Sequence, residues 1–198
     1  MTTYTLTVAP KSARWWKITN DAASYALTGA LQTTGRTGNR WHCSLSWTRD
    51  RDNFRVISAL LDQLHGQRHR ISIPWSKLGY VRAGVGGGVP LLNGAHSSGA
   101  TTANIKGMSL STTGVLQPGD WLQIGNQLVR AVTILSSDGS GNGSCTIFPE
   151  LHKAYADSQA VDYDSPEGVF FWVNDSGNEQ DHKGIGTISA EFEQDVLA

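Results

Sequence analysis

Hydrophobic and polar positions alternate along several short stretches of the chain, which predicts a protein built mainly of β-strands. The clearest stretch is 40–48, where apolar and polar side chains lie on opposite faces: Trp41, Cys43, Leu45 and Trp47 against His42, Ser44 and Ser46. Weaker extended segments are expected at 4–8 and 15–18, and alternation returns at 70–75. One face of this sheet should therefore be buried.

The period changes between these strands, where five apolar residues recur at helical spacing: Phe54, Ile57, Leu60, Leu61 and Leu64. The pattern predicts a helix over 53–65 whose leucines lie on the sheet. Asp50 or Asp52 can cap its start, and Gly66 stands where a left-handed residue often ends a helix.

A second module begins after the glycine run 84–88, which is typical of a linker or hinge. Short strands are expected at 103–110, 121–124, 127–135 and 144–148, with turns at 116–120 and 125–126. This spacing favours a small closed barrel of the SH3 or OB type. Apolar strands at 169–173 and 187–192 resemble the first module more than the second, which predicts a first domain, 1–83 and 168–198, with an inserted domain, 84–167.

Two connections are long for a compact domain, 19–40 and 84–100. Their length suits loops that become ordered on a partner.

The composition narrows the functional classes. The net charge is −1 and only 17% of the residues are charged, against roughly 25% in average soluble domains. General attraction to nucleic acid or to an anionic membrane is therefore not expected. No apolar run approaches the roughly 20 residues of a membrane span, and the N-terminus does not resemble a secretory signal. Two cysteines are too few for a disulfide framework, which favours synthesis in a reducing cytoplasm.

No catalytic motif emerges from the chain, and we expect neither an enzyme nor a bound cofactor. The segments 94–99 and 141–145 do not fit the G-x-S-x-G pattern of a hydrolase. The glycine run at 84–88 lacks the Gly-Lys-Ser/Thr of a phosphate loop. Cys43 and His42 are neighbours on a strand and so point to opposite faces, which argues against a thiol–imidazole pair.

We also expect no metal site. His65 and His69 have a metal-like spacing, but Gly66 should end the helix between them, and neither a carboxylate nor a cysteine accompanies them. Acidic residues gather at 157–167 and 175–181, where a solvated rim is the leading interpretation and loop-bound calcium the minor alternative.

The seven tryptophans mark either core or binding surface. Trp41, Trp47 and Trp75 lie on apolar faces and are expected in the core. Trp15 and Trp16 must point to opposite sides of an extended backbone, so one of them can be exposed. An exposed tryptophan could contribute to a subunit interface or to a sugar-stacking surface.

The order of motifs resembles the distal tail proteins of long-tailed bacteriophages. The resemblance covers nearly the whole chain, through these segments: 29–33 (GALQT), 40–41 (RW), 64–67 (LHGQ), 71–74 (ISIP), 116–125 (LQPGDWLQIG), 127–132 (QLVRAV), 138–143 (DGSGNG) and 147–151 (IFPEL).

The resemblance implies a tail-tube-like β-sandwich with one flanking helix and an inserted OB-like barrel. It further implies a structural virion protein of the tail tip, assembled in the bacterial cytoplasm into a hexameric ring of identical subunits. Such a ring joins the tail tube to the tip hub or receptor-binding proteins, and DNA passes through its lumen. The alternative from another functional class is a carbohydrate-binding β-sandwich module that uses Trp15, Trp16 or Trp121 as a stacking platform.

Overall fold

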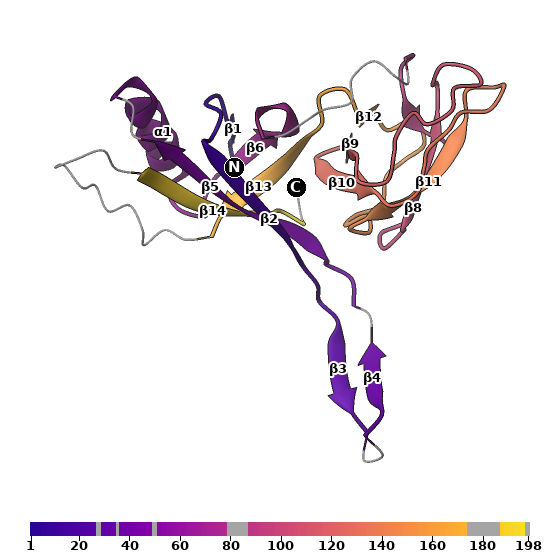
Figure 1. Ribbon diagram of the computed structural model, residues 1–198, viewed down its shortest axis with the longest axis horizontal. Coiled ribbons are helices and arrows are strands. Elements are labelled where there is room, and N and C mark those ends of the chain that lie inside the picture. Colours follow the sequence, from indigo (N-terminus) through magenta and orange to yellow (C-terminus); the bar gives the residue numbers. More distant parts are fainter. Residues whose placement is uncertain (27–28, 35, 49–50, 79–86, 174–186, 197–198) are drawn as a thin grey trace.

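The computed structural model describes residues 1–26, 29–34, 36–48, 51–78, 87–173 and 187–196. Within them the protein is mainly β, with two six-stranded sheets, a separate two-stranded hairpin and one α-helix (Figure 1). The mainly β class predicted from the alternating pattern is confirmed. No helix of the described residues is long and apolar enough to cross a lipid bilayer.

The first sheet combines both ends of the sequence. Its strands are β1 (Thr3–Thr5), β2 (Ser12–Ile18), β5 (Arg40–Thr48), β6 (Arg70–Pro74), β13 (Glu167–Trp172) and β14 (Thr187–Gln194). They lie in the order β1-β6-β13-β14-β5-β2, so β1 and β2 form the two edges. β1 runs parallel to β6, and the other neighbours are antiparallel.

One face of this sheet holds the core, because the strand register aligns the apolar residues. Phe192 lies opposite Cys43 and Phe170 lies opposite Ile71, and all four side chains are fully buried. The helix α1 (Arg51–Leu64) contributes further residues to the same core, which are Ile57, Leu60, Leu61 and Leu64. The predicted strand at 40–48 and the predicted helix are both confirmed.

The helix boundaries refine the prediction. α1 begins at Arg51, so Asp52 is a residue of its first turn, while Asp50 lies outside the described residues. After Leu64, both His65 and Gly66 have a positive φ, of 46° and 65°. The chain therefore leaves the helix in the left-handed region one residue earlier than predicted, and the His69 amide donates to the Leu64 carbonyl.

The opposite face of the first sheet is polar. Ser46 lies between Ser12 and Ser189, and Ser44 lies between Arg14 and Glu191, all at least partly exposed. Within the described residues, the apolar face packs against α1 and the barrel, and no second sheet of the same unit completes a β-sandwich.

The second sheet forms a nearly closed barrel. Its strands are β7 (Leu91–Leu92), β8 (Thr102–Lys106), β9 (Trp121–Ile124), β10 (Gln127–Ala131), β11 (Gly143–Phe148) and β12 (Val161–Asp162). Their order is β12-β9-β10-β11-β8-β7, and a bridge between Leu91 and Ala160 brings the two edges together. A separate apolar core fills it. The predicted barrel is thus present as a nearly closed sheet, while its OB or SH3 type stays a prediction.

Several strands are shorter in the structure than the sequence pattern predicted. The strand expected at 103–110 ends at Lys106, and the strand expected at 127–135 ends at Ala131. The extended segment at 4–8 narrows to Thr3–Thr5, and Trp75 begins a short 3₁₀ turn, η1 (Trp75–Lys77), rather than ending β6.

The glycine run predicted to be a hinge is partly packed. Residues 84–86 lie outside the described residues, but Gly88 lies against the chain that follows β8: a Cβ added there would meet the Gly107 carbonyl oxygen at 2.1 Å. The Val89 amide donates to that same carbonyl, and Tyr163 donates its hydroxyl to the Gly87 carbonyl. The last two glycines of the run thus allow close backbone packing rather than hinge motion.

Candidate functional site

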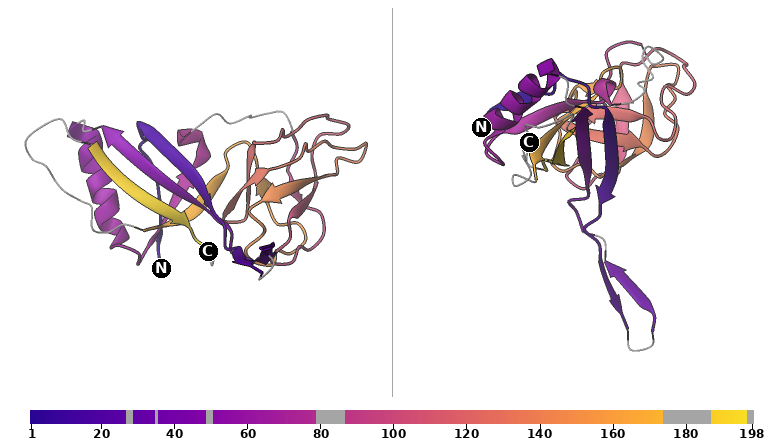
Figure 2. Two further views of the ribbon diagram at one scale, coloured as in Figure 1. Left: turned by 60° about the horizontal axis from the view of Figure 1, so that its bottom comes forward. Right: turned by 60° about the vertical axis from the view of Figure 1, so that its left-hand side comes forward.

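A β-hairpin projects from the body of the molecule. It consists of β3 (Ala22–Tyr25) and β4 (Leu31–Thr34), which pair only with each other (Figure 1). The right-hand view of Figure 2 shows the hairpin extending far from both sheets. The prediction that 19–40 is a loop is therefore corrected: the segment forms a two-stranded arm.

The arm is largely exposed, including its apolar residues. Tyr25 and Leu31 lie opposite each other in the register and are 78% and 56% exposed. An isolated two-stranded hairpin is only marginally stable in water, because it has little surface against which to pack. The arm therefore has the character of a segment that a partner covers.

The base of the arm is held firmly by the barrel. Glu150, which directly follows β11 and Pro149, accepts hydrogen bonds from the Gly38 amide (2.8 Å), the Asn39 amide (3.1 Å) and the Asn39 side chain (2.9 Å). His152 Nε2 lies 2.8 Å from the Asn39 carbonyl oxygen. Asn39 also accepts a hydrogen bond from the Asn20 amide, which joins the two strands of the arm at their root.

These contacts set the ionisation of both groups. Burial alone would raise the pKa of the Glu150 carboxyl, but the hydrogen bonds from its own backbone, Asn39 and Gly38 hold that pKa below its usual value. Burial lowers the pKa of His152, against the opposing effect of its contact with Asn39. At neutral pH this junction thus contains an ionised carboxylate and a neutral imidazole.

Aromatic residues join the barrel to the apolar face of the first sheet. Trp121 of β9 packs against Trp75, Trp41 and Trp15, with ring centroids 4.3, 4.7 and 5.6 Å away. Arg130 lies over the Trp41 ring at 5.3 Å and the Trp121 ring at 5.9 Å. The barrel is thus packed on the sheet by a continuous aromatic layer.

Two of the three candidate stacking residues lie within this aromatic layer, and the third lies outside it. Trp15 and Trp121 are partly buried within it, whereas Trp16 lies on the polar face and is 40% exposed. Trp16 stacks on His42, with ring centroids 4.2 Å apart and planes inclined by 22°. His42 lies between Glu191 and Glu193, each 3.6 Å away. Trp41 and Trp47 are buried and Trp75 is partly buried against the core, as predicted.

The other candidate residues lie apart from any common site. Cys43 points into the core, where burial raises the pKa of its thiol, and His42 lies on the opposite face, as expected for strand neighbours. Cys145 is buried in the barrel, which raises its pKa to about 11. His65 and His69 both follow the last residue of α1, and their ring centroids are 5.8 Å apart.

The acidic loop residues bind their own chain. Asp157 accepts hydrogen bonds from Lys106 and the Gly94 amide, both at 2.7 Å. Asp162 accepts from the Asp164 and Ser165 amides. Asp175, Glu179 and Asp181 lie outside the described residues. Among the residues that are described, no group of three potential ligands lies close enough to hold a metal ion.

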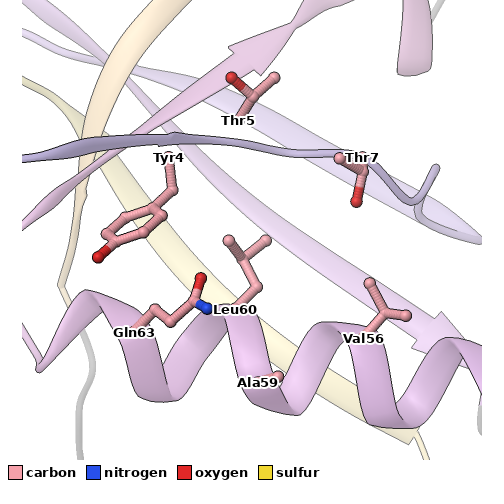
Figure 3. Close-up of a pocket in the computed structure, with 7 residues that line it drawn as sticks. All are labelled: Tyr4, Thr5, Thr7, Val56, Ala59, Leu60 and Gln63. Carbon is pink, nitrogen blue, oxygen red and sulfur yellow. The ribbon is translucent and has the colours of Figure 1, made fainter.

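A shallow groove lies at the β1 edge, on the side of the first sheet that α1 covers. Residues of β1 and the chain just after it form one wall, and residues of α1 form the other: Tyr4, Thr5 and Thr7 against Val56, Ala59, Leu60 and Gln63 (Figure 3). The sequence patterns did not predict this groove, because it depends on the parallel pairing of β1 with β6. The arm has one sequence signal: Gly29, a typical turn residue, lies between two short segments of equal length, as in a β-hairpin.

No model of a protein family matches the sequence, and no curated protein shows significant similarity to it.

Proposed function

We propose that this chain is a structural subunit of a bacteriophage tail tip that assembles with copies of itself, most simply into a hexameric ring. The observation that carries the proposal is the unsupported arm, 22–34, which leaves the body of the molecule and finds no covering surface among the described residues of its own chain. The order of sequence motifs resembles that of distal tail proteins, and this resemblance is the reason for proposing that the assembly is a phage tail tip.

Two further features support a self-assembling subunit. β1 and β2 are open edges of the first sheet, and an open edge can pair with a strand from a neighbouring subunit. The low content of charged residues suits a chain that buries much of its surface in contacts with other chains. In a ring, sheets of adjacent subunits would together build a tail-tube-like architecture.

In this proposal the two modules have different tasks. Residues 1–83 and 168–198 build the ring, whose lumen admits DNA and whose ends meet the tail tube and the tip hub or receptor-binding proteins. Residues 84–167 form the inserted barrel, which is packed on the ring-building sheet through Trp121 and held to the base of the arm through Glu150.

The test is the oligomeric state of the purified chain. Size-exclusion chromatography with light scattering should give a mass several times that of the 21.4 kDa chain, and electron micrographs should show closed six-fold rings. A stable monomer at all accessible concentrations would overturn the proposal.

The second candidate is a carbohydrate-binding module, which the exposed Trp16 favours. Its ring is presented on a polar face beside Glu191, which is the arrangement of a single stacking position for a sugar. Trp15 and Trp121 are less suited to this task, because they pack within the aromatic layer. A monomeric chain that binds glycans, and loses that binding in Trp16→Ala, would establish this alternative.

A further inference from the structure

The groove between β1 and α1 has the form of a docking site for an extended segment. It has a volume of about 350 Å³. Figure 3 shows Tyr4 and Thr7 directed from the β1 segment toward the helix, with Leu60 and Val56 rising from α1. Val56 is 46% exposed although it is apolar. None of the seven lining residues carries a charge at neutral pH.

The outer side of the groove is an open strand edge. β1 pairs with β6 on one side, and among the described residues no strand lies on its other side. The pairing uses the backbone of Thr2 and Leu6, which donate to or accept from Arg70 and Ser72. Alternate residues of a strand direct their N–H and C=O groups to opposite sides, so those of Thr3 and Thr5 face outward. An added strand could bind there through its main chain.

The arm of the same chain matches this groove in chemistry. No charged residue occurs between Asp21 and Arg36, so the whole of β3 and β4 is uncharged, like the groove. Tyr25 and Leu31 present two exposed apolar side chains at adjacent positions, which suit the exposed Val56 and the wall formed by Leu60. Among the described residues of the chain, no strand pairs with the outer edge of β1, and β3 and β4 pair only with each other.

The arm cannot reach the groove of its own chain. Its root is fixed by Glu150 and by the Asn20–Asn39 hydrogen bond, and Figure 1 shows it leaving the body on the side away from α1. Strand residues advance by roughly 3.3 Å each, so the eight steps from Ile18 to Ala26 span at most about 26 Å beyond the sheet. The arm is therefore placed to contact a second copy.

We propose that the arm of one copy docks in the β1–α1 groove of a second copy, with a strand of the hairpin along β1 and with Tyr25 and Leu31 against Val56 and Leu60. The contact joins two different surfaces, so its repetition in one direction produces a ring or a longer stack. This inference rests on the proposed function, because it names the surfaces through which the subunits assemble.

Disulfide crosslinking between copies tests the contact directly. Leu31→Cys and Val56→Cys are combined in one chain and oxidised after assembly; native Cys43 and Cys145 are buried and should not react. We expect a ladder of covalent multimers. A mixture of the two single variants should give covalent dimers that contain one chain of each. The matched control replaces Val56→Cys by Val132→Cys, an apolar residue of the barrel that is 49% exposed, and should give no ladder.

Charge substitution provides a second readout that does not depend on disulfide geometry. Leu31→Glu and Val56→Glu should each weaken assembly by about tenfold or more, because an unpaired carboxylate would be buried in the contact. Leu31→Glu combined with Val56→Lys should recover part of the loss. Val132→Glu should leave assembly unchanged. Circular dichroism of each variant monitors the fold, which should persist because all three positions are exposed.

The outcomes separate this inference from the proposed function. Rings that form normally in Leu31→Glu and Val56→Glu, without a crosslinked ladder, would overturn the docking contact and leave the ring intact. A wild-type chain that is monomeric would overturn both. A ladder that ends at the number of subunits in one ring places the contact within the ring, whereas a longer ladder places it between rings; either ladder supports the docking of arm and groove.

Discussion

The junction between barrel and sheet and the projecting arm adjoin each other in the structure, yet they are stabilised in opposite ways. At the junction, four tryptophans pack together and Glu150 receives three hydrogen bonds. In the arm, eight strand residues pair across one narrow ribbon, and seven of the eight are exposed. The first region is complete within one chain, and the second is not.

The contrast indicates which region to examine for function when the described residues form no catalytic constellation. A region that satisfies its own hydrogen bonds and buries its own apolar surface gives stability but offers little to a partner. An exposed ribbon with two apolar side chains has the opposite character, because its folding gains little without a partner. Substitutions at the junction should therefore lower the free energy of unfolding. Substitutions in the arm should change it least and should instead affect assembly.

Trp121→Ala should have the largest effect on stability. It removes the ring that contacts Trp15, Trp41 and Trp75, and large-to-small changes of packed aromatic residues cost about 3–5 kcal/mol. Because Trp121 is only partly buried, we expect about 3 kcal/mol in the free energy of unfolding, measured by urea denaturation with circular dichroism. Val132→Ala, on the exposed barrel surface, should change it by less than about 0.5 kcal/mol. A loss below about 1 kcal/mol in Trp121→Ala would contradict the aromatic junction.

Glu150→Gln should come next, with a loss of about 1–3 kcal/mol. The carboxylate accepts from three N–H groups of Gly38 and Asn39, and an amide in its place brings N–H donors toward other donors. The measurement is a double-mutant cycle with Asn39→Ala. The sum of the two single losses should exceed the loss in the double variant by more than about 0.5 kcal/mol, since both substitutions break the contact between the Asn39 side chain and Glu150. Additive losses would show that Glu150 and Asn39 contribute independently to stability.

Acidification should weaken the same junction. The pKa values of His152 and Glu150 are lowered on folding from ordinary values of 6.5 and 4.5. Near and below pH 6.5 His152 is protonated to a greater extent in the unfolded chain than in the folded chain, so the unfolded state binds more protons and stability falls as the pH falls. Glu150 adds a further fall below pH 4.5. Urea denaturation between pH 7.5 and 4 should follow this course.

His152→Asn provides the control for the first part of that pH profile. Its slope of stability against pH between 7 and 5.5 should be shallower than that of the wild type, whatever its absolute stability. His69, whose pKa is also lowered, is retained in both proteins and keeps the slope above zero. An unchanged slope would show that His152 does not remain neutral in the folded chain.

The positions of the strands and the helix could be predicted from the sequence better than the contacts between them. Period-two alternation located β5 at both ends, and helical spacing located α1, because burial of one face selects those patterns directly. The strand predicted at 121–124 is also present as β9, and its neighbours Trp121 and Leu122 pack in different cores. Local pattern could not show that Trp121 meets Trp75, or that Glu150 meets Asn39, since those contacts depend on how two sheets pack.

The candidate docking surfaces were harder to predict for a related reason. Polar and small residues between Asp21 and Arg36 are typical of a loop, because strand patterns are strong only where one face is buried. An arm that is exposed on both faces lacks that signal. The groove joins Tyr4 to Val56 across the parallel β1–β6 pairing, which no short motif marks.

The smallest effect on stability should come from the arm itself. Tyr25→Ser combined with Leu31→Ser should change the free energy of unfolding of the single chain by less than about 0.5 kcal/mol, because both side chains are already exposed in the folded state.

Hydrogen exchange offers the sharper measurement. In the unassembled chain, the amides of β3 and β4 should exchange much faster than those of β5, which lies inside the first sheet. In the wild-type assembly the same arm amides should become protected, whereas in the double-serine variant they should stay unprotected. Slow exchange of the arm in the single chain would mean that the hairpin is stable alone, and its exposure would then no longer indicate a missing partner.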